Sequence, residues 1–243
     1  MKLHYDLHIH SCLSPCADDE MTPCNITALA EMLGLDVIAV SDHNSMLNSG
    51  AVIKAGARLG ISVLPAMELE TAENVHILML FASLSRGMEF YREFTPHLPR
   101  MKNRPEIFGE QAITDENDVI VGTESNLLLT ASDIGVYDCA ALAAKYGGVA
   151  IPAHVDRESN GLIAILGDID DGMGFSTVEV SPNADAEFVA RLESRGYRVI
   201  QNSDAHRLES INIPNDGNAL TVDTPDAATV IETLKTKKGV NTQ

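Results

Sequence analysis

Asp6-Leu7-His8-Ile9-His10-Ser11, near the start of the chain, combines a short apolar run with two histidines that are one residue apart. Residues i and i+2 of a β-strand point to the same face, so both imidazoles can bind one metal ion. Further potential ligands follow downstream, mostly where a strand is predicted to end: His43, Glu68, His76, His154, Asp204 and His206. Together with His8 and His10, this set contains six of the eight histidines of the chain. Packing alone does not explain such a concentration.

The sequence around these residues alternates between strand and helix patterns. Thr22-Pro23 is a typical helix start, and Gly34 ends the helical spacing that follows. Strands are predicted at 35–40, 61–68, 75–81, 149–154, 177–180 and 198–204, and further helices at about 47–59, 138–146, 184–195 and 225–235. The alternation predicts an α/β fold with a parallel sheet or barrel, in which ligands gather at the carboxyl ends of the strands.

The pattern loosens between residues 84 and 137, where prolines and glycines are frequent. The length of 243 residues is sufficient for one sizeable core. We therefore expect a single domain over residues 1–243, with an insertion or long loops at about 84–137.

The net charge of −18 argues against a duplex nucleic-acid surface, which normally requires clustered Lys and Arg. The N-terminus has no pattern of a signal peptide, and no apolar run reaches membrane-spanning length. We expect a cytoplasmic protein with no membrane partner and with reduced cysteines. The sequence does not indicate the oligomeric state.

The ligand types and their number indicate more than one metal ion. Imidazole and carboxylate ligands suit Zn, Mn or Fe, and a glutamate can bridge two ions. With Asp18 or Asp19 added, the set offers nine ligands, which is too many for one ion that must keep a position for water or substrate. Two or three divalent ions are therefore predicted, and clustered ions about 3.5–4 Å apart suit displacement at phosphorus.

As an ordered set, these motifs resemble those of the PHP-domain (polymerase and histidinol phosphatase) phosphoesterases. The matching stretches are His8-x-His10, Ser41-Asp42-His43-Asn44, Glu68, His76, Pro152-Ala153-His154 and Asn202-Ser203-Asp204-Ala205-His206. The resemblance implies a distorted (β/α)7, TIM-like barrel that holds a trinuclear metal site and hydrolyses phosphate esters.

The resemblance also implies a role for each matched position. The first ion would be held by His8, His10, Glu68 and Asp204, the second by Glu68, His76 and His154, and the third by an Asp of the first loop with His43 and His206. Asp42 would orient a ligand imidazole.

The first loop departs from the family pattern. Members often have Ser-Asp-Gly soon after the HxH motif, whereas this chain has Ser14-Pro15-Cys16-Ala17-Asp18-Asp19-Glu20. Counting back from Thr22-Pro23 favours Asp18 as the third-ion ligand, and Asp19 and Glu20 are the alternatives.

The predicted reaction is hydrolysis of a phosphate ester by a metal-activated hydroxide, with Glu68, Asp204 and His206 at the reacting centre. His206 would also assist proton transfer to the leaving oxygen. Arg157 is the first candidate for binding phosphate, because a guanidinium can contact two phosphate oxygens; the others are Arg100 and Arg104. The expected substrate is a small phosphorylated molecule, such as a nucleotide or sugar phosphate.

Two alternatives keep the metals but change the function. An amidohydrolase-like barrel also has an N-terminal HxH motif, although it usually has a bridging lysine and no lysine follows a predicted strand here. The other alternative is a metal-binding regulatory module without turnover. The sequence contains no GxGxxG, P-loop or GxSxG motif. It therefore does not indicate nucleotide binding through the first two motifs or a serine hydrolase.

Overall fold

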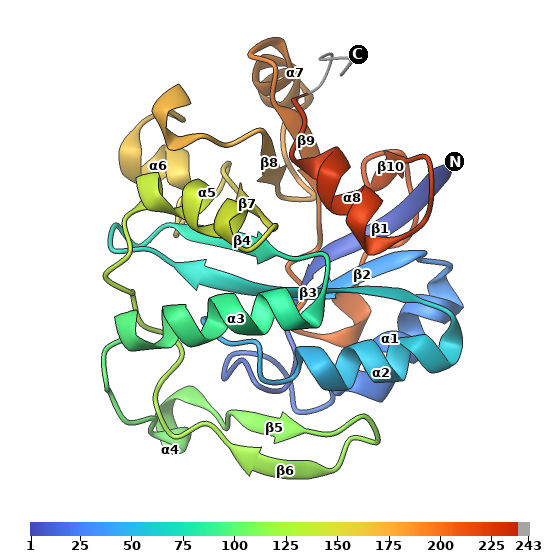
Figure 1. The fold of residues 1–243 in the computed structure, drawn as a ribbon, viewed down its shortest axis with the longest axis vertical. Coiled ribbons are helices and arrows are strands. Elements are labelled where there is room, and N and C mark those ends of the chain that lie inside the picture. Colours follow the sequence, from blue (N-terminus) through green and yellow to red (C-terminus); the bar gives the residue numbers. More distant parts are fainter. Residues whose placement is uncertain (238–243) are drawn as a thin grey trace.

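A curled sheet forms the centre of the structure, a computed structural model that describes residues 1–237 (Figure 1). The last six residues of the predicted domain, 238–243, lie outside this range. The sheet has the order β10-β1-β2-β3-β4-β7. Its strands are β1 (Lys2–Ile9), β2 (Val37–Val40), β3 (Ser62–Glu70), β4 (His76–Leu80), β7 (Val149–Pro152) and β10 (Ala219–Thr221).

A parallel pair, β8 (Thr177–Val180) and β9 (Arg198–Gln201), closes the gap between the two ends of this curl. Val155 N donates to Glu179 O at 2.9 Å, which joins β7 to β8. On the other side, His10 N donates to Ala205 O at 2.9 Å and a parallel bridge links Ile9 to Ala205, which joins the end of β9 to β1. Strands β1, β2, β3, β4, β7, β8 and β9 thus form the predicted distorted, TIM-like barrel, which is confirmed.

Strand β4 runs against its neighbours, and here the prediction of a parallel arrangement is wrong. It pairs antiparallel with β3 and with β7. A parallel crossover needs a dozen or more residues, whereas only residues 71–75 separate the two strands. Because of this reversal, the beginning of β4 lies at the same edge as the carboxyl ends of β1, β2 and β3.

Helices cover the outside of the barrel, except α4 (Pro105–Phe108), which lies with the hairpin of the inserted region (Figure 1). The others are α1 (Pro23–Leu33), α2 (Ser49–Leu59), α3 (Leu84–Phe94), α5 (Val136–Lys145), α6 (Leu162–Leu166), α7 (Ala186–Ser194) and α8 (Ala227–Leu234), with 3-10 turns at Thr95–His97, Asp171–Met173 and Leu208–Ser210. Helix α1 begins as predicted, because the Thr22 side chain accepts a hydrogen bond from Asn25 N, and it ends at Gly34 in the left-handed region (φ 82°). Within residues 1–237, no helix has the length and apolar character needed to cross a membrane.

Alternation along the strands separates an inner from an outer hydrophobic cluster. Leu64 and Ala66 of β3 and Leu78 of β4 belong to the inner cluster, which fills the barrel. Their neighbour Met67 belongs to the outer cluster beneath α3 and α5. Glu68 continues the inner phase of β3, so it faces the interior of the barrel at its open end.

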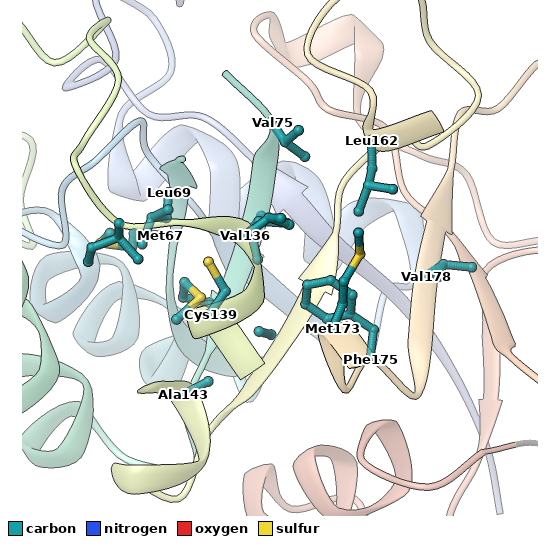
Figure 2. Close-up of a cluster of buried hydrophobic side chains, with 14 of the residues drawn as sticks. Met67, Leu69, Val75, Val136, Cys139, Ala143, Leu162, Met173, Phe175 and Val178 are labelled. Carbon is teal, nitrogen blue, oxygen red and sulfur yellow. The ribbon is translucent and has the colours of Figure 1, made fainter. Parts of the chain in front are cut away.

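The outer cluster fixes the helices against the sheet. Figure 2 shows part of it, in which Val136, Cys139 and Ala143 of α5 lie beside the strands. All three side chains are fully buried. This packing holds the ends of β3, β4 and β7 in place.

Residues 84–137, predicted as an insertion or long loops, contain one regular helix that was not expected. Helix α3 packs Phe90 and Phe94 into the outer cluster. The rest includes α4 and a hairpin of β5 (Ala112–Thr114) and β6 (Ile120–Thr123). Figure 1 shows this hairpin at one end of the molecule, away from the central sheet.

Candidate metal centre

A bulge in β1 turns His8 and His10 toward the barrel interior. The register between β1 and β2 shifts between Asp6 and Ile9. Leu7 packs in the inner cluster but Ile9 packs under α1, so after the bulge the two histidines face inward. Both side chains are fully buried, and their Nε2 atoms are 3.2 Å apart. The pair can therefore bind the same ion.

Glu68 lies at the centre of the cluster and contacts five imidazoles, of which His10 is the most distant, with its Nε2 3.5 Å from Glu68 Oε2. Its Oε1 is 2.9 Å from His76 Nδ1, and its Oε2 is 2.9 Å from His43 Nδ1. Oε1 is also 3.2 Å from His154 Nε2 and 3.2 Å from His8 Nε2. A carboxylate with imidazoles around both oxygens is suited to bridging two ions.

His154 and Asp204 have left-handed backbone conformations, with φ of 32° and 53°. Such conformations cost about 1–3 kcal/mol for a non-glycine residue and concentrate at functional sites. They redirect both side chains at the ends of β7 and β9. As a result, Asp204 Oδ1 lies 3.1 Å from His8 Nε2 and 3.0 Å from His10 Nε2.

Ligand atoms converge in three overlapping groups, each with its atoms within 4.8 Å of one another. The groups are His8–His10–Asp204, His43–Glu68–His76 and His10–His43–His206. In the first group the nitrogen and oxygen atoms are 3.0–3.2 Å apart. Ligands bound about 2.0–2.2 Å from one ion have similar separations. The spacing of this group therefore fits a divalent ion.

Three buried polar atoms in the cluster make no hydrogen bond with any part of residues 1–237: Glu68 Oε2, Asp204 Oδ1 and His154 Nδ1. A buried polar group without a partner costs about 1–3 kcal/mol. Coordination would satisfy the two carboxylate oxygens. The donor set thus fits divalent metal ions in chemistry as well as in spacing.

The charges of the cluster shift its pKa values strongly. Burial disfavours the charged form of His8, but Glu179, Asp204 and Glu68 raise the pKa of His8 well above its usual value. Burial also opposes charge on Asp204, yet His8 and His10 hold the pKa of Asp204 well below its usual range. In the absence of metal, imidazolium and carboxylate groups balance one another, and a bound ion must displace the protons.

Glu179 of β8, which the sequence analysis missed, supports two ligands at once. Its carboxylate lies 3.0 Å from His8 Nδ1 and accepts a hydrogen bond of 3.0 Å from His154 N. Asn202 Nδ2 donates to the other oxygen at 2.7 Å. Glu179 is 1% exposed. A carboxylate in the apolar run 177–180 was the sequence feature that could have identified it, because buried charges need partners.

Asp42, predicted to orient a ligand imidazole, reaches the cluster through a serine. Ser14 Oγ donates to Asp42 Oδ1 at 2.8 Å and lies 2.9 Å from His10 Nδ1. Ser11 also donates to Asp42 through its backbone N at 2.7 Å. These bonds hold the first loop against β2 and fix the ring of His10.

Asp18, the predicted ligand of the third ion, does not lie in any of the three groups. Its side chain is 53% exposed, and Oδ2 is 3.5 Å from Arg207 Nε. The alternatives Asp19 and Glu20 are exposed as well. The first loop therefore places its carboxylates on the surface.

Cys16 is an exposed residue of the same loop and also lies outside the three groups, but its side chain interacts with the His43 and His206 rings. Partial burial favours the neutral thiol, but His206 and His43 lower the pKa of Cys16 to about 7. Burial likewise disfavours charge on His43, whereas Glu68 and Cys16 raise the pKa of His43 to about 10. The sequence favoured an acid of this loop, because the spacing Cys12-x3-Cys16-x7-Cys24 matches no familiar zinc or iron–sulfur motif.

Three arginines were predicted to bind phosphate, and all three lie in the described range 1–237. Of these, only Arg157 reaches the cluster. Its Nη1 pairs with Asp204 Oδ2, and its side chain is 40% exposed. Arg100 is exposed and lines a separate cavity near Tyr91. Arg104 is exposed and lies 3.7 Å from a carboxylate oxygen of Glu106.

Comparisons with known proteins find one matching family model and several solved structures with a similar fold. The family model of the PHP domain matches residues 6–140. Endonuclease Q from Pyrococcus furiosus is similar over the whole chain, with a TM-score of 0.73 and 19% identity, and an Endonuclease Q complex with a 27-mer duplex gives 0.70 and 18%. A protein of Bifidobacterium adolescentis assigned as a metal-dependent phosphoesterase gives 0.60 and 18%, over 97% of both chains. A search of curated proteins finds no match.

These structural similarities show the fold alone, because each identity is below 25%. The chain spans 57% of the length of the Pyrococcus furiosus Endonuclease Q and 58% of the chain in the duplex complex.

The expectation that this chain has no duplex nucleic-acid partner is wrong as an exclusion. In the Endonuclease Q complex, which has a similar fold, the duplex carries an abasic lesion at the active site. Net charge averages over the whole surface, whereas bound cations and a few basic side chains determine the potential at a site. An overall charge of −18 therefore does not exclude a nucleic-acid partner.

Proposed function

The chain belongs to the PHP-domain family of metal-dependent hydrolases, and on this premise we propose that it hydrolyses phosphate esters. The observation that carries the proposal is the convergence of imidazoles and carboxylates from six strand ends around Glu68. Multinuclear sites of this composition suit displacement at phosphorus.

Two or three divalent ions, with Mn, Fe and Zn as candidates, would be held by the chain's own side chains. His8, His10, Glu68 and Asp204 would hold one, Glu68, His76 and His154 a second, and His43 with His206 a third. When bound, such ions would activate a water molecule and neutralise charge on the phosphate oxygens.

The rim of the cluster supplies the remaining groups. Glu68 and Asp204 have pKa values held low by neighbouring imidazoles, so they act as ligands and not as proton donors. Burial disfavours charge on His206, but Cys16 and Asp204 raise its pKa; with 28% of its side chain exposed, it is placed to donate a proton to a leaving oxygen. Arg157, beside Asp204, would bind a phosphate oxygen.

Two substrate classes follow from different observations. The burial of the ligands His8, His10, Glu68 and His154 favours a small phosphorylated compound, such as a nucleotide or sugar phosphate. The similarity to Endonuclease Q over the whole chain favours cleavage of a phosphodiester in nucleic acid. In either case the bond broken is a phosphate ester.

The test is hydrolysis by protein reconstituted with Mn, Zn or Fe(II). The panel contains p-nitrophenyl phosphate, bis-p-nitrophenyl phosphate, nucleotides, sugar phosphates and a duplex with an abasic site. We expect metal-dependent turnover that Asp204→Asn abolishes and that Asp216→Asn, at a fully exposed position, leaves unchanged. Failure of the metal-loaded protein on every substrate, or full activity of Asp204→Asn, would overturn the proposal.

A further inference from the structure

The third group of metal ligands differs from the other two in charge. His8–His10–Asp204 and His43–Glu68–His76 each include a carboxylate, whereas His10–His43–His206 contains imidazoles only. Three neutral imidazoles leave the full charge of a divalent ion uncompensated in a site that is largely buried. An anionic ligand next to His43 and His206 would offset this charge.

The thiol of Cys16 occupies this position. It lies within hydrogen-bonding reach of both rings. Among residues 1–237, no such interaction is seen for the carboxylates of this loop: Asp18 Oδ2 lies 3.5 Å from Arg207 Nε, and Asp19, which is exposed like Cys16, is in no ligand group.

The backbone holds Cys16 in place. Ala17 N donates to Ser14 O at 2.9 Å, which closes a turn with Cys16 in its third position. Asp18 N donates to His206 O at 2.9 Å, so the loop is tied to the segment that carries one of the two imidazoles. The contact between the thiol and the histidines is thus built into the fold of the loop.

The other thiols are directed elsewhere. Cys12 lies 4.0 Å from Ala112 O, Cys24 lies 3.4 Å from Glu116 O, and Cys139 lies 3.6 Å from Gly135 O. Cys24 is partly accessible and provides a matched control for substitution.

We propose that Cys16, as a thiolate, binds the divalent ion held by His43 and His206. This inference rests on the proposed multinuclear site and replaces the expected Asp18 with a sulfur ligand. A thiolate favours Zn, Fe(II) or Co(II) over Mn, so the third position would differ in metal preference from the positions built on carboxylates. It would also make this position sensitive to thiol oxidation.

Cobalt substitution tests the proposal without any substrate. We expect the Co(II)-loaded wild-type protein to show a near-ultraviolet sulfur-to-cobalt charge-transfer band. Cys16→Ser should lose the band, and Cys24→Ser should keep it. Cys16→Asp should bind as many equivalents of Co(II) as the wild type, without the band, because a carboxylate replaces the thiolate.

The outcomes separate this inference from the proposed function. Full Co(II) loading of the wild type without the band, or a band that persists in folded Cys16→Ser, would overturn the thiolate ligand even if phosphate esters are hydrolysed. A band that depends on Cys16 supports the ligand even if no phosphate ester is hydrolysed. Absence of any Co(II) uptake would overturn the thiolate ligand, whereas the proposed function is decided by hydrolysis with Mn, Zn or Fe(II).

Discussion

Glu179 shows how a single residue outside the ligand set determines the position of two ligands. It contacts the ring of His8 and the backbone of His154, which lie on strands β1 and β7. With its own position on β8, it also connects the strand pair that closes the barrel to the two sides of the site. Its negative charge fixes the proton of His8 on Nδ1 and leaves Nε2 free for a metal ion.

We predict that Glu179→Gln weakens metal binding by about 10- to 100-fold, the usual effect of removing such a partner. The amide keeps the shape of the side chain but loses the charge that supports His8. Competition with a chelator measures the affinity, and Glu187→Gln, at an exposed position of α7, is the control. Equal affinities of Glu179→Gln and the wild type would show that this contact is only structural.

The titrating groups of the cluster predict how the stability of the metal-free protein depends on pH. The folded state raises the pKa of His8, His43 and His206 above the usual value, to about 10 for His43. These groups bind more protons folded than unfolded, so the stability that they contribute is fully present below about pH 6.5 and is lost as pH rises toward 10. Cys16, with its pKa lowered to about 7, opposes this trend. So does His10, because burial and the nearby His206 and His43 hold its pKa well below the usual value, but its effect is confined to pH values near 6.5 and below.

We therefore expect the Tm of the protein in chelator to fall between pH 6.5 and 9.5. The Tm gained on metal binding should increase as pH rises, because ions compete with protons for the same nitrogens. Thermal unfolding at a series of pH values, with and without metal, measures both. A chelated protein whose Tm rises over this range would contradict the assigned charge states.

At the scale of elements, the inserted region supports the first loop. Ala112 N donates to Cys12 O at 3.1 Å, and Gly109 follows α4 with a φ of 100°. A Cβ atom at Gly109 would clash with the carbonyl oxygen of Pro15, the residue before Cys16. The insertion is thus in direct contact with the first loop, which lies beside the metal centre.

Gly109→Ala is predicted to destabilise the protein by more than about 1 kcal/mol, because the backbone conformation and the close approach both oppose a side chain. It should also reduce metal binding at the His43–His206 position by shifting the first loop. Denaturant unfolding and metal content measure the two effects. Gly122→Ala is the control, since its Cβ would meet only Ile113 Cδ1 at 3.8 Å; equal stabilities of the two variants would contradict the contact.

Sequence periodicity predicted the barrel elements well where the spacing was regular, as in α1 and β3. It missed α3, although Gly87, Phe90, Tyr91 and Phe94 have the helical spacing of a buried face. The prolines that follow α3 are typical of loops, and they obscured the helical pattern before them. The reversal of β4 was recognisable from the short connection 71–75, which cannot hold a crossover helix.

At the scale of the whole molecule, the meeting of ligands followed from one topological rule. Parallel strands bring their carboxyl ends to one edge, so the sequence alone predicts that His43, Glu68 and Asp204 lie close together. Glu179 and Cys16 could not be placed in this way, because their roles depend on which side chains meet across the barrel and on the course of an irregular loop. The order of the motifs predicts the metal ligands. The residues that orient these ligands depend on tertiary contacts, which the sequence does not reveal.

The central claim is that one cluster holds several metal ions, and anomalous scattering from metal-loaded crystals tests it most directly. The account predicts two or three peaks, about 3.5–4 Å apart, around Glu68 and within bonding distance of His8, His10, His76, His154 and Asp204. A single peak at full occupancy, or metal bound only outside this cluster, would contradict it.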